Sequence, residues 1–106
     1  MPKKSVSSKL TAKRIIAELR KHVKKLKVYK VKSIALFGSH LKGNAKKTSD
    51  LDFLVIFEKT TFDNYTNLKI FLERLFKKKV DLITESNLKP AFSYVKKEAQ
   101  YVRAWF

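Results

Sequence analysis

Aspartate is scarce in this chain, and three of its four copies stand in or beside strongly apolar segments. Asp50 and Asp52 flank Leu51 at the start of a long apolar run, so in a strand both carboxylates face the same side, about 6.5 Å apart along the chain. Two neighbouring carboxylates repel each other, and a divalent cation relieves that repulsion. Asp81 lies in the next apolar run and completes a triad if the two strands are neighbours. The alternatives are an Asp-rich strand entry and, for Asp81, a strand-edge residue.

A second candidate is the pair Gly38-Ser39, which follows an apolar run and precedes residues that can form one helical turn. Glycine lets a phosphate approach the backbone closely, and backbone N–H groups at the start of a helix attract anions. The serine hydroxyl adds a further donor. Taken alone, the pair also fits an ordinary strand exit.

The elements that position these residues follow from apolar periodicity and end signals. Thr11 and Asp63 suit helix N-caps, and Pro90 suits the first turn of a last helix. The order predicts a small α/β sheet with helices on at least one face. The expected segments are a helix over Leu10–Lys27, a strand over Ser33–Phe37, a helical turn over Ser39–Lys42, a strand over Leu51–Phe57, a helix over Asp63–Phe76, a strand over Lys79–Thr84 and a helix from Pro90 through Val102.

Gly38-Ser39, ten intervening residues and Asp50-x-Asp52 together resemble the signature of the DNA polymerase beta-like nucleotidyltransferase superfamily. The resemblance is greatest to its minimal nucleotidyltransferase branch, whose stand-alone members are antitoxins of HEPN toxins. It extends from the first helix through Asp81 to the closing helix. It implies a mixed β-sheet with flanking helices and a two-metal Mg²⁺ site held by Asp50, Asp52 and Asp81.

The same resemblance implies nucleotide binding by Gly38, Ser39, Lys42 and Ser49, with ATP as the donor. Many members of the family have Arg at the positions of His40 and Lys42, and neither replacement offers a bidentate fork. His40 either contacts a triphosphate or is an exposed turn residue, and the exposed turn residue is the favoured interpretation.

The net charge of +16, from 25 Lys plus Arg against 9 Asp plus Glu, favours an anionic partner. Such a partner could be a nucleotide, nucleic acid bound through the basic surface, or an acidic protein. A general lysine bias is the alternative explanation of the charge. With no cysteine, thiol catalysis and disulfides are excluded. We expect one domain over residues 10–106 behind a flexible basic tail over residues 1–9, no membrane segment and a cytoplasmic location.

Three functions are consistent with these residues. The first is transfer of AMP from ATP to a tyrosine of a partner HEPN toxin, which the resemblance implies. The second is a small-molecule nucleotidyltransferase of the aminoglycoside type. The third is a non-catalytic basic module that binds a toxin or RNA. The C-terminal aromatics Trp105 and Phe106 either cap the core or dock a partner.

Overall fold

The computed structural model of the chain describes residues 10–85, 90 and 94–102. Both the tail over residues 1–9 and the terminal pair Trp105 and Phe106 lie outside these residues. In the described part, no helix is long and apolar enough to cross a bilayer. The elements are α1 (Ala12–Lys21), α2 (Val23–Val28), β1 (Val31–Phe37), α3 (Ser39–Lys42), β2 (Leu51–Phe57), α4 (Phe62–Phe76), β3 (Val80–Thr84), α5 (Tyr94–Glu98) and β4 (Gln100–Tyr101).

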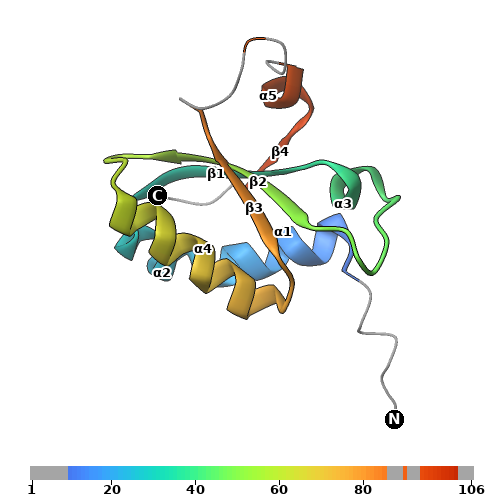
Figure 1. Ribbon diagram of the computed structural model, residues 1–106, viewed down its shortest axis with the longest axis horizontal. Helices are drawn as coiled ribbons and strands as arrows, with labels where there is room; N and C mark the ends of the chain where they lie inside the picture. Colours follow the sequence, from blue (N-terminus) through green and yellow to red (C-terminus); the bar gives the residue numbers. More distant parts are fainter. Residues whose placement is uncertain (1–9, 86–89, 91–93, 103–106) are drawn as a thin grey trace.

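The sheet is mixed, as predicted, with the strand order β3-β2-β1-β4 (Figure 1). β1 pairs antiparallel with both β2 and β4, whereas β2 and β3 run parallel. The parallel pair needs a crossover connection, and α4 supplies it. β2 is therefore an inner strand with a neighbour on each side, which agrees with its almost uninterrupted apolar sequence.

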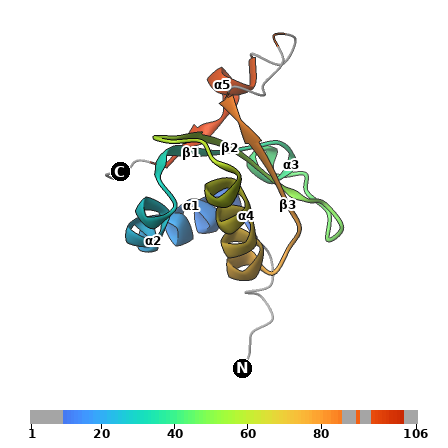
Figure 2. The same cartoon turned by 60° about the vertical axis from the view of Figure 1, so that its left-hand side comes forward.

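Helices α1, α2 and α4 cover one face of the sheet (Figures 1 and 2). The core lies between these layers, where Leu51, Phe53 and Val55 of β2 are fully buried. Because side chains alternate along a strand, Asp52 must lie on the opposite face from these three residues. Apolar burial thus orients the strand and, with it, the carboxylate. The helical part of the core comprises Ile15, Ile16, Leu19, Leu26, Leu68, Leu72 and Phe76.

The first helical segment is broken, contrary to the single helix expected over Leu10–Lys27. Its start is as predicted, with the backbone N–H of Arg14 donating to Thr11 Oγ1 at 3.2 Å. The break falls at His22, whose backbone leaves helical geometry and whose N–H bonds the Leu19 carbonyl. The His22 ring Nδ1 also bonds the Glu18 carbonyl at 2.9 Å. The ring of His22 thus takes a carbonyl that a backbone N–H would bond in a continuous helix. The apolar periodicity of the sequence does not reveal such a local bond.

The N-cap of α4 is Thr61 and not Asp63, so the prediction for Asp63 is wrong. Thr61 has extended backbone geometry, and its hydroxyl accepts a hydrogen bond from the N–H of Asn64 at 3.0 Å. Asp63 lies in the first turn, where a negative charge still interacts favourably with the helix dipole. Both residue types favour N-caps, and only the backbone path decides between them.

α4 also protects the outer edge of β3, which is an edge strand. The Tyr65 hydroxyl donates to the Leu82 carbonyl at 2.6 Å, and the Val80 N–H donates to Glu73 Oε2 at 3.0 Å. Unpaired edge groups are templates for association with other strands. Two side chains of the crossover helix thus satisfy backbone groups that no strand pairs.

The last helix differs most from expectation. It was predicted to continue through Val102, but α5 ends at Glu98 and Gln100–Tyr101 form β4. β4 pairs with β1, and the N–H of Val102 donates to the Ile34 carbonyl at 3.0 Å. This pairing joins residues far apart in the sequence, and it outweighs the local helical spacing of Val95, Ala99 and Val102.

We predict that Thr61→Ala lowers the free energy of unfolding by about 1 kcal/mol, because the first turn of α4 loses its side-chain acceptor. Urea denaturation of the purified chain measures the change. Asp63→Ala is the matched control and should cost less, since it removes only a dipole interaction of a few tenths of a kcal/mol at an exposed position. A larger loss for Asp63→Ala would show that Asp63 is the cap.

Candidate active site

Parallel pairing of β2 with β3 places two of the three candidate carboxylates opposite each other. Asp52 is the register partner of Asp81, between the pairs Leu51–Val80 and Phe53–Leu82. Residues in register on adjacent parallel strands project from the same face, so both carboxylates lie on the face away from α1, α2 and α4. Asp50 directly precedes β2 at the same end.

The three carboxylates interact electrostatically. Burial, followed by the charges of Asp81 and Asp50, raises the pKa of Asp52 from 3.8 to about 6. Asp52 is partly buried, whereas Asp50 and Asp81 are exposed. A carboxylate that two others make harder to ionise is a site where a cation would be favourable.

Gly38 packs directly against Asp52. β1 ends at Phe37, the register partner of Asp52, so the chain leaves the strand beside that carboxylate. Gly38 has φ 80°, a region that favours glycine, and a Cβ at this position would collide with Asp52 Oδ2. The sequence predicted Gly38 as a point where a phosphate approaches the backbone closely. The structure adds a steric reason for glycine here, which is the contact with Asp52.

The predicted turn after Gly38 is present as α3. The N–H groups of Leu41 and Lys42 both donate to the Gly38 carbonyl at 3.1 Å. Gly43 ends the turn in the left-handed region, and its N–H bonds the Ser39 carbonyl. Ser39 is thus the first residue of α3, next to the Gly38–Asp52 contact, while Lys42 is exposed at its end.

Ser49 has a structural partner. Its hydroxyl accepts a hydrogen bond from the N–H of Lys46 at 2.9 Å, and its own N–H donates to the Lys46 carbonyl at 2.9 Å. These bonds close the turn that leads into Asp50. Nucleotide binding by Ser49 stays a prediction, as do the roles of Gly38, Ser39 and Lys42.

His40 is not an exposed turn residue, contrary to the favoured interpretation. Its side chain is 3% exposed, and its Nδ1 has no hydrogen-bond partner. Burial and the charge of Lys78 lower its pKa, while a hydrogen bond to the backbone of Asp50 acts in the opposite direction. His40 therefore lies under the segment that carries Asp50.

Tyr65 lies near the site, although nothing in the sequence around it predicted a functional role. It holds the Leu82 carbonyl next to Asp81, and its pKa is raised by burial and then by the charge of Asp81. Its position in the apolar stripe of α4 indicated a core residue. Only the packing of α4 against β3 brings its hydroxyl to this strand.

The donor set fits Mg²⁺ in one specific sense. Among the residues that the structure describes, no three His, Cys, Asp or Glu side chains form a preformed cage for a metal ion. Mg²⁺ is usually held by one or two carboxylates together with water and substrate phosphates, so such a cage is not needed. Burial is the largest cause of the raised pKa of Asp52, and the repulsion from Asp81 and Asp50 that adds to it supplies the reason for a cation at this point.

We predict that Gly38→Ala destabilises the chain by more than about 2 kcal/mol, since the new Cβ meets a partly buried carboxylate and the backbone has a positive φ. Thermal and urea denaturation measure the loss. Gly43→Ala is a matched control with the same φ of 80° but nothing within 4 Å of the added Cβ. It should cost only about 1 kcal/mol. Equal losses in the two variants would refute the steric role of the Asp52 contact.

We further predict that Asp52→Asn stabilises the metal-free chain by about 1 kcal/mol at pH 7. The folded-state pKa is raised to about 6, so stability is greatest below pH 3.8 and is lost as the pH rises through 6. Asparagine cannot ionise, so the variant avoids this loss of stability. Solvent screening makes the loss smaller than the full pKa shift would give. Unfolding in EDTA between pH 4 and 8 measures it, with Asp63→Asn as control. A destabilised Asp52→Asn chain would show that this carboxylate is structural.

Comparison with known proteins identifies the family. The model of the nucleotidyltransferase domain matches residues 16–104. The protein adenylyltransferase MntA of Thermococcus cleftensis is 38% identical over 96 residues, which cover 88% of this chain and 97% of that protein.

Two solved structures have the same fold. One, provisionally named a minimal nucleotidyltransferase, is 31% identical and superposes with a TM-score of 0.72 over 84% of this chain and 93% of its own. The other comes from a complex of a tri-AMPylated Shewanella oneidensis HEPN toxin with an MNT antitoxin. It is 19% identical with a TM-score of 0.61, over 85% of this chain and 72% of that one. The family model covers most of the chain and the relative is spanned almost completely, so the chain belongs to the nucleotidyltransferase domain family.

Proposed function

We propose that this chain is an antitoxin that transfers AMP from ATP to a tyrosine hydroxyl of a partner HEPN toxin. The observation that carries the proposal is the pairing of Asp52 with Asp81, with Gly38 packed against Asp52. The names of a relative that this chain nearly spans and of a structural neighbour supply the acceptor class: a protein adenylyltransferase and a complex with an AMPylated HEPN toxin.

Each carboxylate has a role in this reaction. Asp50, Asp52 and Asp81 would hold Mg²⁺, with two ions in the complete site, and Asp81 would lie on the acceptor side. When bound, Mg²⁺ would neutralise the charge that develops on the attacking and leaving oxygens. The acceptor oxygen attacks the α-phosphorus in line, the bond from that phosphorus to the β-phosphate oxygen breaks, and pyrophosphate leaves. Asp81 is placed to take the proton of the hydroxyl.

The phosphates of ATP lie against the start of α3. Gly38 brings the backbone close to Asp52, so that phosphates held at the carboxylates would lie near it, and Ser39 adds a hydroxyl at the first residue of the turn. Lys42 and Ser49 complete the nucleotide contacts that we propose. Lys42 acts as a flexible point charge and not as a planar fork.

The partner approaches the face that carries the carboxylates. Helices α1, α2 and α4 all lie on the opposite face, so they do not obstruct the approach of an acceptor to Asp81 (Figure 2). A net charge of +16 steers an acidic partner toward this chain. The use of ATP places the reaction in the cytoplasm.

Two other functions have weaker support. Aminoglycoside acceptors are cationic, and a chain of net charge +16 repels them. Nucleic-acid binding rests on charge alone, since the comparisons give it no support. A binding module would also have no need for two like charges in register.

The test is an adenylylation assay with the full chain, Mg²⁺, a purified HEPN-domain protein from the same genome and each of ATP, GTP, CTP and UTP labelled at the α-phosphate. We expect label from ATP on the partner, located by mass spectrometry to a tyrosine. Asp81→Asn should lower transfer at least about a hundredfold, the lower range for loss of a general base. Asp63→Asn is the control and should transfer at the rate of the unsubstituted chain.

Other outcomes would overturn the proposal. Transfer to kanamycin without label on the partner would identify a small-molecule enzyme. Neutralisation of the toxin by Asp50→Ala, with no label on it, would identify a binding module. RNA binding that Asp50→Ala leaves unchanged, in the absence of any transfer, would assign the basic surface to nucleic acid.

A further inference from the structure

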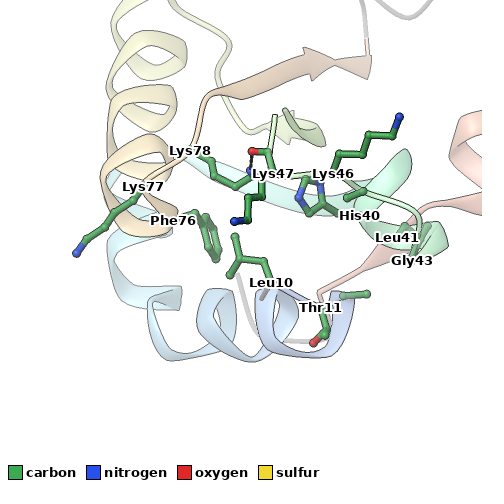
Figure 3. A pocket seen from close by; sticks show the side chains of 12 residues that line it. Leu10, Thr11, His40, Leu41, Gly43, Lys46, Lys47, Phe76, Lys77 and Lys78 are labelled. Carbon is green, nitrogen blue, oxygen red and sulfur yellow. Dashed lines mark hydrogen bonds between the residues drawn. The ribbon is translucent and has the colours of Figure 1, made fainter. Parts of the chain in front are cut away.

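A large basic pocket lies beside the carboxylates but is not lined by them. Its volume is about 880 Å³, and it is bounded by the start of α1, by α3 with the loop that follows, and by the end of α4 (Figure 3). This size is within the range of small-molecule sites. The lining combines apolar residues such as Leu10, Leu41 and Phe76 with Lys46, Lys47, Lys77 and Lys78.

The charge of this pocket is unbalanced. Four lysines line it, and none of its lining residues is acidic. The positive end of the α1 dipole adds to this field, since Thr11 and Ala12 line the pocket and the first turn of α1 carries no acidic residue. Like charges held together in this way favour a bound anion of more than one charge.

His40 supplies an independent observation that points to a ligand. It lines the pocket, its side chain is 3% exposed, and its buried Nδ1 has no hydrogen-bond partner among the residues that the structure describes. A buried polar atom left without a hydrogen bond costs about 1–3 kcal/mol, so such atoms are rare without a reason. A ligand polar group at this point would remove the cost.

Figure 3 shows which cation faces His40. The side chain of Lys47 points into the space between His40, Phe76 and Leu10, whereas Lys46 and Lys77 point away from it. The ammonium group of Lys78 is already engaged with the Lys47 carbonyl at 2.8 Å. Lys47 and His40 therefore form the polar end of the pocket, next to an apolar wall.

We propose that this pocket is a second ligand site, separate from the catalytic carboxylates, that binds a phosphate monoester with an apolar or aromatic body. The phosphate lies between Lys47 and His40, and the body packs on Leu10 and Phe76. This site is independent of the proposed transfer to a toxin.

A phosphate monoester fits these residues better than a carboxylate does. The hydroxyl of its singly protonated form donates a hydrogen bond to an unprotonated Nδ1 of His40, and its other oxygens accept from the ammonium group of Lys47. Its negative charge suits Lys47, the lysine whose side chain points toward His40 (Figure 3). Lysine is a common point-charge partner of phosphate.

The experiment is a titration of the full chain with AMP in EDTA, so that no Mg²⁺ supports nucleotide binding at the carboxylates. Calorimetry gives Kd, and amide chemical shifts locate the ligand. We expect shifts centred on residues 40–47 and 76–78. Lys47→Gln should weaken AMP binding about tenfold, as expected for one charge-assisted hydrogen bond. Inorganic phosphate and adenosine should each bind more weakly than AMP.

A control makes the result decisive. Lys24→Gln removes the same charge from an exposed position of α2 outside the pocket. It should bind AMP with the Kd of the unsubstituted chain. The proposal fails if Lys47→Gln and Lys24→Gln weaken binding equally, if the shifts centre on Gly38 and Asp81, or if phosphate or adenosine binds as tightly as AMP.

Discussion

The parallel pairing of β2 with β3 is the constraint on which the site depends. It sets Asp52 beside Asp81 and holds two like charges together in the absence of a metal. The pKa of about 6 for Asp52 corresponds to at most about 3 kcal/mol at neutral pH, and less because the group is partly solvated. On the other face, Leu51, Phe53 and Leu82 are buried, each worth about 2 kcal/mol. Apolar packing on one side of the sheet therefore outweighs the repulsion on the other.

The turn after β1 shows the same balance between stability and chemistry. Gly38 has a positive φ, which favours glycine. In addition, the Asp52 carboxylate occupies the space that a side chain at this position would need. The chain then forms only four residues of helix, closed by a second glycine. A helix this short gains little stability of its own, so its position depends on the strand β1 that it follows and on the burial of the side chain of His40, its second residue.

His40 joins two regions of opposite charge. Its ring bonds the backbone of Asp50, at the acidic end of β2, while the same ring lines a pocket with four lysines. The acidic region suits a cation and the basic region suits an anion, and the two are divided by α3 and the loop that precedes Asp50. Separation of this kind lets one small chain hold both charges without pairing them with each other.

Much of this protein is determined by its sequence alone. Strand β2 has the predicted bounds, because a run from Leu51 to Phe57 with so few polar residues can only be an inner strand. The prediction that Asp50 and Asp52 face one side follows from the two-residue period of a strand, and the α3 turn follows from its glycines. These features depend on neighbours in the sequence, which is why local patterns predict them, whereas Asp81 reaches Asp52 only through the pairing of β2 with β3.

Other features were decided only by tertiary structure. Thr61 caps α4 in place of Asp63 because of the path of the incoming chain, and Gln100–Tyr101 form a strand because β1 offers an unpaired edge. His40 is buried because α1 packs against α3, although its own neighbours predicted an exposed turn. In each case the deciding contact joins segments that are distant in the sequence, and its energy exceeds the small local preference that the sequence displays.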